Sequence, residues 1–233
     1  MRIHLKWERK YLDILVLTAY YNFMLEVTII RIYQSKVGKV FRVIIIMLLV
    51  LIENQVVMSL INRGLYVGRF QPFHLGHLGA IKEALTKVDE LVIVIGSAQH
   101  SHKLKNPFTA GERLVMIQHS LQEANVDLDR VWIVPVPDMH LHMLWVSAVE
   151  GYVPKFNKLY SNEPLTRRLF IESGYTVENI SLFDRKMYSS TFVREKMLKG
   201  EDWEVLVPKS VADFIKNIDG INRLRDLART DKI

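Results

Sequence analysis

From residue 63 to the C-terminus, short runs of β-branched and other apolar residues alternate with amphipathic stretches of helical length. The uninterrupted apolar run at residues 91–95 predicts a strand buried on both faces. Residues 109–112, Thr-Ala-Gly-Glu, form a capping box and predict a helix that runs to about Ala124. Because strands separated by helices pair in parallel, the pattern predicts an α/β fold with a doubly wound, Rossmann-like parallel sheet and C-terminal helices. Such folds bind ligands at the carboxyl ends of their strands, where the strand order reverses.

The same pattern gives the remaining elements. Strands are predicted at residues 65–67, 91–95, 131–136, 158–161 and 180–183. Helices are predicted at residues 77–87, 109–124, 141–153, 164–173, 191–199 and 208–218. Gly200 and Gly220 are expected to end the last two helices, because glycine readily adopts the left-handed backbone that terminates many helices.

Residues 1–57 differ in composition, with a single glycine, no proline and no clear turn signals. Their most apolar run, residues 43–52, is ten residues long, whereas a membrane-spanning helix needs about 20. No small-residue cleavage site follows that run, as a secretory signal would require. Met58 stands just before the first predicted strand, so we expect the folded domain to comprise residues 58–233, without membrane contact. Residues 1–57 are interpreted as a start-site artefact or a dispensable extension, with attachment to a membrane surface as the alternative.

Composition excludes several classes of protein. Hydrophobic residues make up 49% of the chain, which is enough for a substantial core. The lack of cysteine excludes a disulfide framework, a thiolate metal site and a cysteine nucleophile, and it favours a cytoplasmic location. Eight Lys and Arg accompany four Asp and Glu in residues 1–57, but 23 accompany 21 in residues 58–233. The predicted domain is nearly neutral, which argues against a nucleic-acid partner.

The segment after the first predicted strand carries the most specific chemical signal. Residues 68–77 read Gly-Arg-Phe-Gln-Pro-Phe-His-Leu-Gly-His and lead into a predicted helix. His74 and His77 are three residues apart, so at a helix start both imidazoles lie on one face beside unpaired backbone N–H groups. Gly68 and Gly76 would let a ligand approach the backbone closely. This geometry predicts a phosphate site. The alternative is a metal pair, but no third ligand of standard spacing is evident nearby.

A second junction between a strand and a helix has similar chemistry. Residues 189–194 read Ser-Ser-Thr-Phe-Val-Arg and open the helix predicted at residues 191–199. Ser190 is the expected N-cap, which leaves backbone N–H groups of the first turn for phosphate oxygens, and Arg194 follows one turn later. Taken alone, this segment could be an ordinary helix cap. Together with residues 68–77 it predicts the second half of a phosphate site.

The chain resembles the archaeal-type nicotinamide-nucleotide adenylyltransferases of the nucleotidylyltransferase superfamily, which share a His-x-Gly-His signature. The resemblance rests on residues 68–77, Gly96-Ser97-Ala98-Gln99, Asn106-Pro107-Phe108-Thr109-Ala110-Gly111-Glu112-Arg113 and residues 189–194. It extends from about Arg63 to the C-terminus and leaves out residues 1–57. It implies transfer of AMP from ATP to nicotinamide mononucleotide (NMN), giving NAD and pyrophosphate, by a homo-oligomer such as a hexamer.

The resemblance also implies roles for single residues. Catalysis and phosphate contacts are assigned to Arg69, His74, His77, Lys105 and Arg194. Further contacts to ATP are assigned to Gly68, Phe70, Gln71, Gly76, Ser189, Ser190 and Thr191. Arg194 would grip the β- and γ-phosphates. Lys105 stands where the family often has arginine and offers charge without a bidentate fork; the alternative is a solvated surface lysine.

Recognition of the acceptor is assigned to the loop and helix after the third predicted strand. The resemblance implies that Trp145 stacks on the nicotinamide ring, and that the preceding loop, with Asp138 and His142, recognises the carboxamide and ribose. The alternative for Trp145 is a core residue on an amphipathic helix. His140 and His142 depart from the asparagine that some relatives have here.

The implied chemistry requires no general base and no covalent intermediate, because the attacking phosphate is already an anion. Mg²⁺ would be held mainly by the phosphates of ATP. Another transferase of the superfamily, such as pantetheine-phosphate adenylyltransferase or a cytidylyltransferase, could use the same phosphate groups. The alternative from a different class is a non-catalytic nucleotide or RNA-binding module, which would bind without releasing pyrophosphate.

Overall fold

The computed structural model describes residue 24 and residues 61–181 and 188–230. Within these residues, five parallel strands form one sheet: β1 (Arg63–Gly68), β2 (Glu90–Ile95), β3 (Val131–Pro135), β4 (Lys158–Tyr160) and β5 (Thr176–Glu178). Their spatial order is β3-β2-β1-β4-β5. The chain therefore adds β2 and β3 on one side of β1, then crosses to add β4 and β5 on the other. The order reverses beside β1, where open α/β sheets bind their ligands.

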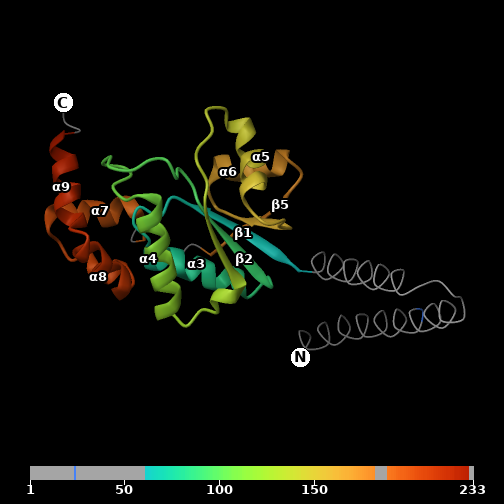
Figure 1. Cartoon of the computed structure of the whole chain (residues 1–233), viewed down its shortest axis with the longest axis horizontal. Coiled ribbons are helices and arrows are strands. Elements are labelled where there is room, and N and C mark those ends of the chain that lie inside the picture. Colours follow the sequence, from blue (N-terminus) through green and yellow to red (C-terminus); the bar gives the residue numbers. More distant parts are fainter. Residues whose placement is uncertain (1–23, 25–60, 182–187, 231–233) are drawn as a thin grey trace, which may run out of the picture. The chain divides into compact units, whose positions relative to one another are not determined.

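Helices cover both faces of the sheet, as Figure 1 shows. On one side, α3 (Leu75–Leu85) and α4 (Ala110–Glu123) contact the sheet, and α7 (Ser190–Lys199), α8 (Lys209–Asn217) and α9 (Gly220–Thr230) complete the same core, with α8 packed on α4. The other face carries α5 (Trp145–Tyr152) and α6 (Pro164–Glu172). Side chains of β2 alternate between the two cores: Leu91 and Ile93 join the first, and Val92 and Val94 join the second. The predicted doubly wound fold and the strand buried on both faces are confirmed.

Single-turn 3₁₀ helices adjoin three of these elements. They are η1 (Leu128–Arg130) before β3, η2 (His142–Leu144) before α5, and η3 (Glu204–Leu206) before α8. The helix predicted at residues 141–153 is therefore a 3₁₀ turn followed by an α-helix. The predicted capping box is present, because the side chain of Thr109 accepts from the N–H of Glu112 and that of Glu112 accepts from the N–H of Thr109. Gly200 ends α7 with φ of 71°, as predicted.

Two predicted elements are wrong. The last strand is β5, which ends at Glu178; both backbone polar groups of Ile180 bond to the side chain of Asn162, and residues 182–183 lie outside the described residues. Gly220 does not end a helix but begins α9, a helix that the sequence pattern did not reveal. A Cβ at this glycine would lie 3.0 Å from the ring of Phe108, so close packing rather than helix termination explains the residue.

The predicted boundary between residues 1–57 and 58–233 lies outside the described residues. In the part of the chain that the structure describes, no helix is both long and apolar enough to cross a membrane.

Candidate active site

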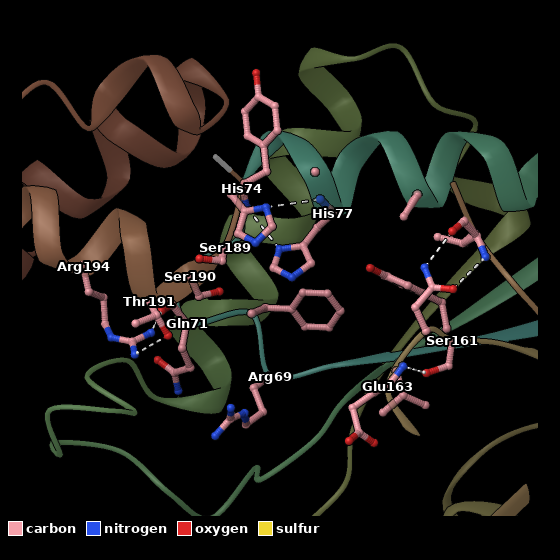
Figure 2. A pocket seen from close by; sticks show the side chains of 18 of the residues that line it. Arg69, Gln71, His74, His77, Ser161, Glu163, Ser189, Ser190, Thr191 and Arg194 are labelled. Carbon is pink, nitrogen blue, oxygen red and sulfur yellow. Dashed lines mark hydrogen bonds between the residues drawn. The ribbon is translucent and has the colours of Figure 1, made fainter. Parts of the chain in front are cut away.

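Two helix starts face one pocket beside the carboxyl end of β1. The pocket has a volume of about 340 Å³ and lies between the first turns of α3 and α7. Figure 2 shows the side chains of Arg69, His77 and Arg194 around it. All of the residues predicted for catalysis line this pocket, and so do all those predicted to contact ATP except Gly68. Because helix N-termini carry unpaired N–H groups and a partial positive charge, the arrangement suits a chain of phosphates.

The two histidines cap α3 in a reciprocal way. The N–H of His77 donates to Nδ1 of His74 at 3.3 Å, and the N–H of His74 donates to Nδ1 of His77 at 3.2 Å. Their rings are stacked with centroids 3.5 Å apart. Since both Nδ1 atoms act as acceptors, this hydrogen-bond pattern assigns the proton of each neutral ring to Nε2. The capping arrangement thus leaves each imidazole with one N–H donor that the backbone does not use.

Both histidines are neutral at ordinary pH. Burial lowers the pKa of His74 to about 3. Burial, and then the neighbouring charge of His74, lower the pKa of His77 well below its usual value. In the absence of ligand, the pair therefore supplies hydrogen-bond donors and no positive charge.

We expect acid to destabilise the protein through this pair. The unfolded chain binds a proton at each imidazole near pH 6.5, whereas folded His74 binds one only near pH 3, so stability is lost as the pH falls through that window. Each such group changes the free energy of unfolding by up to about 1.4 kcal/mol per pH unit. Urea unfolding of wild type and His74→Asn at neutral pH and at about pH 4.5 measures the effect. The variant should lose less stability; equal losses would contradict the assignment.

Gly68 and Gly76, in the segment 68–77, make room for neighbouring protein side chains. A Cβ at Gly68 would lie 2.7 Å from the ring of Phe70, and a Cβ at Gly76 would lie 2.8 Å from Cβ of Tyr188. Phe70 belongs to the same segment as Gly68, whereas Tyr188 lies just before α7, so Gly76 lets the two helix starts pack closely together. Close packing within the protein therefore gives a reason for both glycines, and their predicted role in letting a ligand approach the backbone stays a prediction.

The start of α7 differs from the prediction in one residue. The N-cap is Ser189, whose side chain accepts from the N–H of Phe192 at 3.2 Å, so the prediction of Ser190 as the cap is wrong. Ser190 instead donates its hydroxyl to the carbonyl of Pro72 at 3.0 Å. This bond links the segment 189–194 to the segment 68–77. The hydroxyl of Ser190 is therefore not used to cap α7.

Arg194 brings a second guanidinium to the pocket. Its Nη1 donates to the carbonyl of Gln71 at 2.6 Å, and its Nη2 lies 3.4 Å from Oγ1 of Thr191. Burial, and then the charge of Arg69, lower the pKa of Arg194 to about 10, so the residue stays charged at neutral pH. Arg69 and Arg194 both line the pocket and repel each other, so an anionic ligand between them would be favoured.

Gln71 has a structural task that sequence reasoning missed. Its side-chain amide donates to the carbonyl of Phe108 at 2.9 Å and accepts from the N–H of the same residue at 3.0 Å. Both polar atoms of the amide are therefore engaged by the protein, although the residue lines the pocket. The backbone carbonyl of Gln71 accepts from Arg194, so the residue also positions this cation, and its predicted contact with ATP stays a prediction.

A second pocket of about 680 Å³ adjoins the first, and both are lined by Val67, Arg69 and Glu163. The second pocket contains the three residues predicted to contact NMN, namely Asp138, His142 and Trp145, and it also contains Gly68. Trp145 packs edge-to-face on Phe170 with ring centroids 5.8 Å apart. It therefore joins the core and lines the pocket at once, which leaves one part of the indole available to a ligand.

Asp138 is held in place by the loop that follows β2. Its Oδ1 accepts from the N–H of Ser97 at 3.1 Å. Its backbone exchanges two hydrogen bonds with the side chain of Gln99, at 2.9 and 3.2 Å. The residues predicted for the phosphates and those predicted for the acceptor thus occupy neighbouring pockets at the point where the strand order reverses.

Residues 65–196 match the model of the cytidylyltransferase-like family. The chain therefore belongs to the cytidylyltransferase-like nucleotidyltransferases. The nicotinamide-nucleotide adenylyltransferase of Saccharolobus solfataricus is 48% identical over 171 residues, which span 73% of this chain and 99% of the relative. That of Archaeoglobus fulgidus is 51% identical over 172 residues, spanning 72% of this chain and 99% of the relative. Within the class, the chain belongs to the family of nicotinamide-nucleotide adenylyltransferases.

A solved structure with the same fold is the bifunctional NMN adenylyltransferase/ADP ribose pyrophosphatase of Francisella tularensis, complexed with AMP and a manganese ion. It matches with a TM-score of 0.62 and 27% identity, over 74% of this chain and 53% of that one. The nucleotidyltransferase fold of this chain thus corresponds to about half of that bifunctional protein.

Proposed function

We infer that this chain transfers the AMP part of ATP to NMN, giving NAD and pyrophosphate. The observation that carries the inference is the pair of adjoining pockets that share Arg69. One pocket gathers two helix starts, two imidazole donors and the cationic side chains suited to a triphosphate. The other offers an indole face and a fixed carboxylate, which suit a pyridine ring and a ribose hydroxyl. The relatives named above carry this activity in their names.

In the reaction, a phosphate oxygen of NMN attacks the α-phosphorus of ATP in line. The new P–O bond forms as the bond to the β-phosphate oxygen breaks, and pyrophosphate leaves with that electron pair. The nucleophile is already an anion, so no proton has to be removed. The protein's tasks are to align two anions and to stabilise the charge that develops on the α-phosphoryl and leaving groups.

Each part of the pocket has a proposed task in this step. The Nε2–H groups of His74 and His77 donate to phosphate oxygens as neutral donors. Arg69, which lies between the pockets, bridges the reacting phosphates of the two substrates. Arg194 and Lys105 hold the leaving pyrophosphate, with the first turn of α7 contributing backbone N–H groups.

We propose that Mg²⁺ enters the site with ATP, where it would neutralise part of the triphosphate charge. In the described residues, no three histidine or acidic side chains gather as a metal site. Glu163 is the one carboxylate in the described lining of the phosphate pocket. The donor set therefore fits a cation that takes most of its ligands from phosphate oxygens and water. The homo-oligomeric state and the cytoplasmic location stay predictions.

Incubating the full chain with ATP, Mg²⁺ and one of three acceptors tests the function. NMN should yield NAD and pyrophosphate in equal amounts, and phosphopantetheine should yield neither product above background. Nicotinic acid mononucleotide in a third reaction measures the preference between the acid and the amide. Pyrophosphate release with phosphopantetheine alone would indicate the other transferase. Salt-sensitive binding of RNA without pyrophosphate release would indicate the non-catalytic alternative.

A further inference from the structure

Arg113, at the end of the first turn of α4, is fully buried beneath the carboxyl ends of β1 and β2. Its guanidinium and Nε donate to the carbonyl oxygens of Arg69 (3.0 Å), Gly96 (2.9 Å), Ser97 (3.2 Å), Ala98 (3.5 Å) and Thr109 (3.1 Å). An arginine has five N–H groups, so each finds an acceptor. Burial lowers the pKa of Arg113 to about 10, against the opposing charges of Asp138 and Glu112. The buried side chain is therefore a cation whose hydrogen bonds all go to backbone carbonyls.

Two of those carbonyls precede strained residues. Phe70 and Ser97 adopt left-handed backbone, with φ of 53° and 51°, which is costly for residues other than glycine. Phe70 directly follows the carbonyl of Arg69, and Ser97 directly follows that of Gly96. Arg113 thus holds the start of both loops that lead from the sheet into the two pockets.

One peptide group links Arg113 to Asp138. The carbonyl of Gly96 accepts from Arg113 at 2.9 Å, and the N–H of the same peptide, on Ser97, donates to Oδ1 of Asp138 at 3.1 Å. A cation on one side and an anion on the other therefore fix and polarise this peptide. Asp138 lines the second pocket, and so does Arg69, whose carbonyl Arg113 also holds.

We propose that Arg113 is a positioning residue for the acceptor nucleotide, which acts through the Gly96–Ser97 peptide on Asp138. The guanidinium fork keeps this peptide oriented so that the carboxylate of Asp138 faces the second pocket. The proposal rests on the proposed function and adds a residue that lies beneath the pocket floor, outside the lining of either pocket.

Arg113→Lys tests the proposal, because lysine keeps the charge but lacks the fork. We expect the variant to raise the KM for NMN by about 10-fold or more and to change the KM for ATP by less than about 3-fold. In the Asp138→Asn background, the same change should raise the KM for NMN by no more than about 2-fold, because coupled residues are not additive. Ser97→Gly should partly rescue Arg113→Lys, since glycine adopts the left-handed backbone readily and does not need the hydrogen bonds from Arg113 to hold it.

Several outcomes would overturn the proposal. Equal increases in both KM values, or fully additive effects with Asp138→Asn, would mean that Arg113 only supports the fold. Arg113→Gln, which keeps an amide donor, serves as the second variant, and melting temperature and circular dichroism check folding. If neither variant folds even with Ser97→Gly, the role is structural and the proposal fails. A wild-type chain that makes no NAD would instead remove the proposed function, which separates the two failures.

Discussion

His74→Asn should lower kcat by roughly 100-fold or more while leaving the protein about as stable as wild type at neutral pH. The side chain of asparagine is among the best N-caps, so it can accept the N–H of His77 as Nδ1 of His74 does at 3.3 Å. It does not extend to the position of the imidazole Nε2, so the proposed donor to the phosphates is lost. Capping and catalysis, which one histidine combines, are thereby separated.

His74→Ala is the matched variant for this experiment. Alanine removes both the cap and the donor, so it should match His74→Asn in kcat but lose about 1 kcal/mol more of the free energy of unfolding. Steady-state assays with saturating ATP and NMN, together with urea unfolding at neutral pH, measure the two effects. If His74→Asn stays within a few-fold of wild-type kcat, the donor role assigned to the imidazole is wrong.

The sequence placed the start of α4 correctly and that of α3 within two residues, at His77 instead of Leu75, because local chemistry determines both starts. His74 and His77 cap α3 through bonds that span three residues, and Thr109 caps α4 in the same way. A strand that runs directly into such a cap places it at the carboxyl edge of the sheet, so the phosphate site follows from a short segment and the strand order.

Other features could not be predicted because distant contacts determine them. Ser190 resembles a cap in sequence, but its hydroxyl is taken by Pro72, 118 residues away in the chain. The side-chain amide of Gln71 bonds to the backbone of Phe108, 37 residues away, which its place in the segment 68–77 does not reveal. Gly220 resembles a helix end, but it begins α9 and packs closely against Phe108. In each case the local residue type was compatible with two uses, and tertiary packing selected one of them.

Arg113 illustrates a signal that was present but not assigned. It is the last residue of the segment 106–113, which contributes to the family resemblance, yet three of its bonds reach back across 16 or more residues to the loops that follow β1 and β2. Sequence spacing gives no indication that the carbonyls of Arg69 and Gly96 converge on one side chain. The parallel pairing of β1 with β2 brings them together.

Arg194→Ala should lower kcat/KM for ATP by roughly 1,000-fold, because a partly buried guanidinium that meets the leaving group is lost. Folding should survive, since the change also removes repulsion from Arg69, which already depresses the pKa of Arg194. The reverse reaction identifies the contact. With NAD and pyrophosphate as substrates, the KM for pyrophosphate should rise by about 10-fold or more, and the KM for NAD should change by only a few-fold.

Lys199→Ala is the charge-matched control for this variant. Lys199 is exposed in the last turn of the same helix and does not line either pocket. Its loss removes one positive charge, as Arg194→Ala does, but the charge of an exposed lysine outside the pocket is screened by salt. Kinetics close to wild type are expected for Lys199→Ala. If Arg194→Ala instead raised the KM for NAD as much as that for pyrophosphate, Arg194 would act on the whole site and would not specifically hold the leaving group.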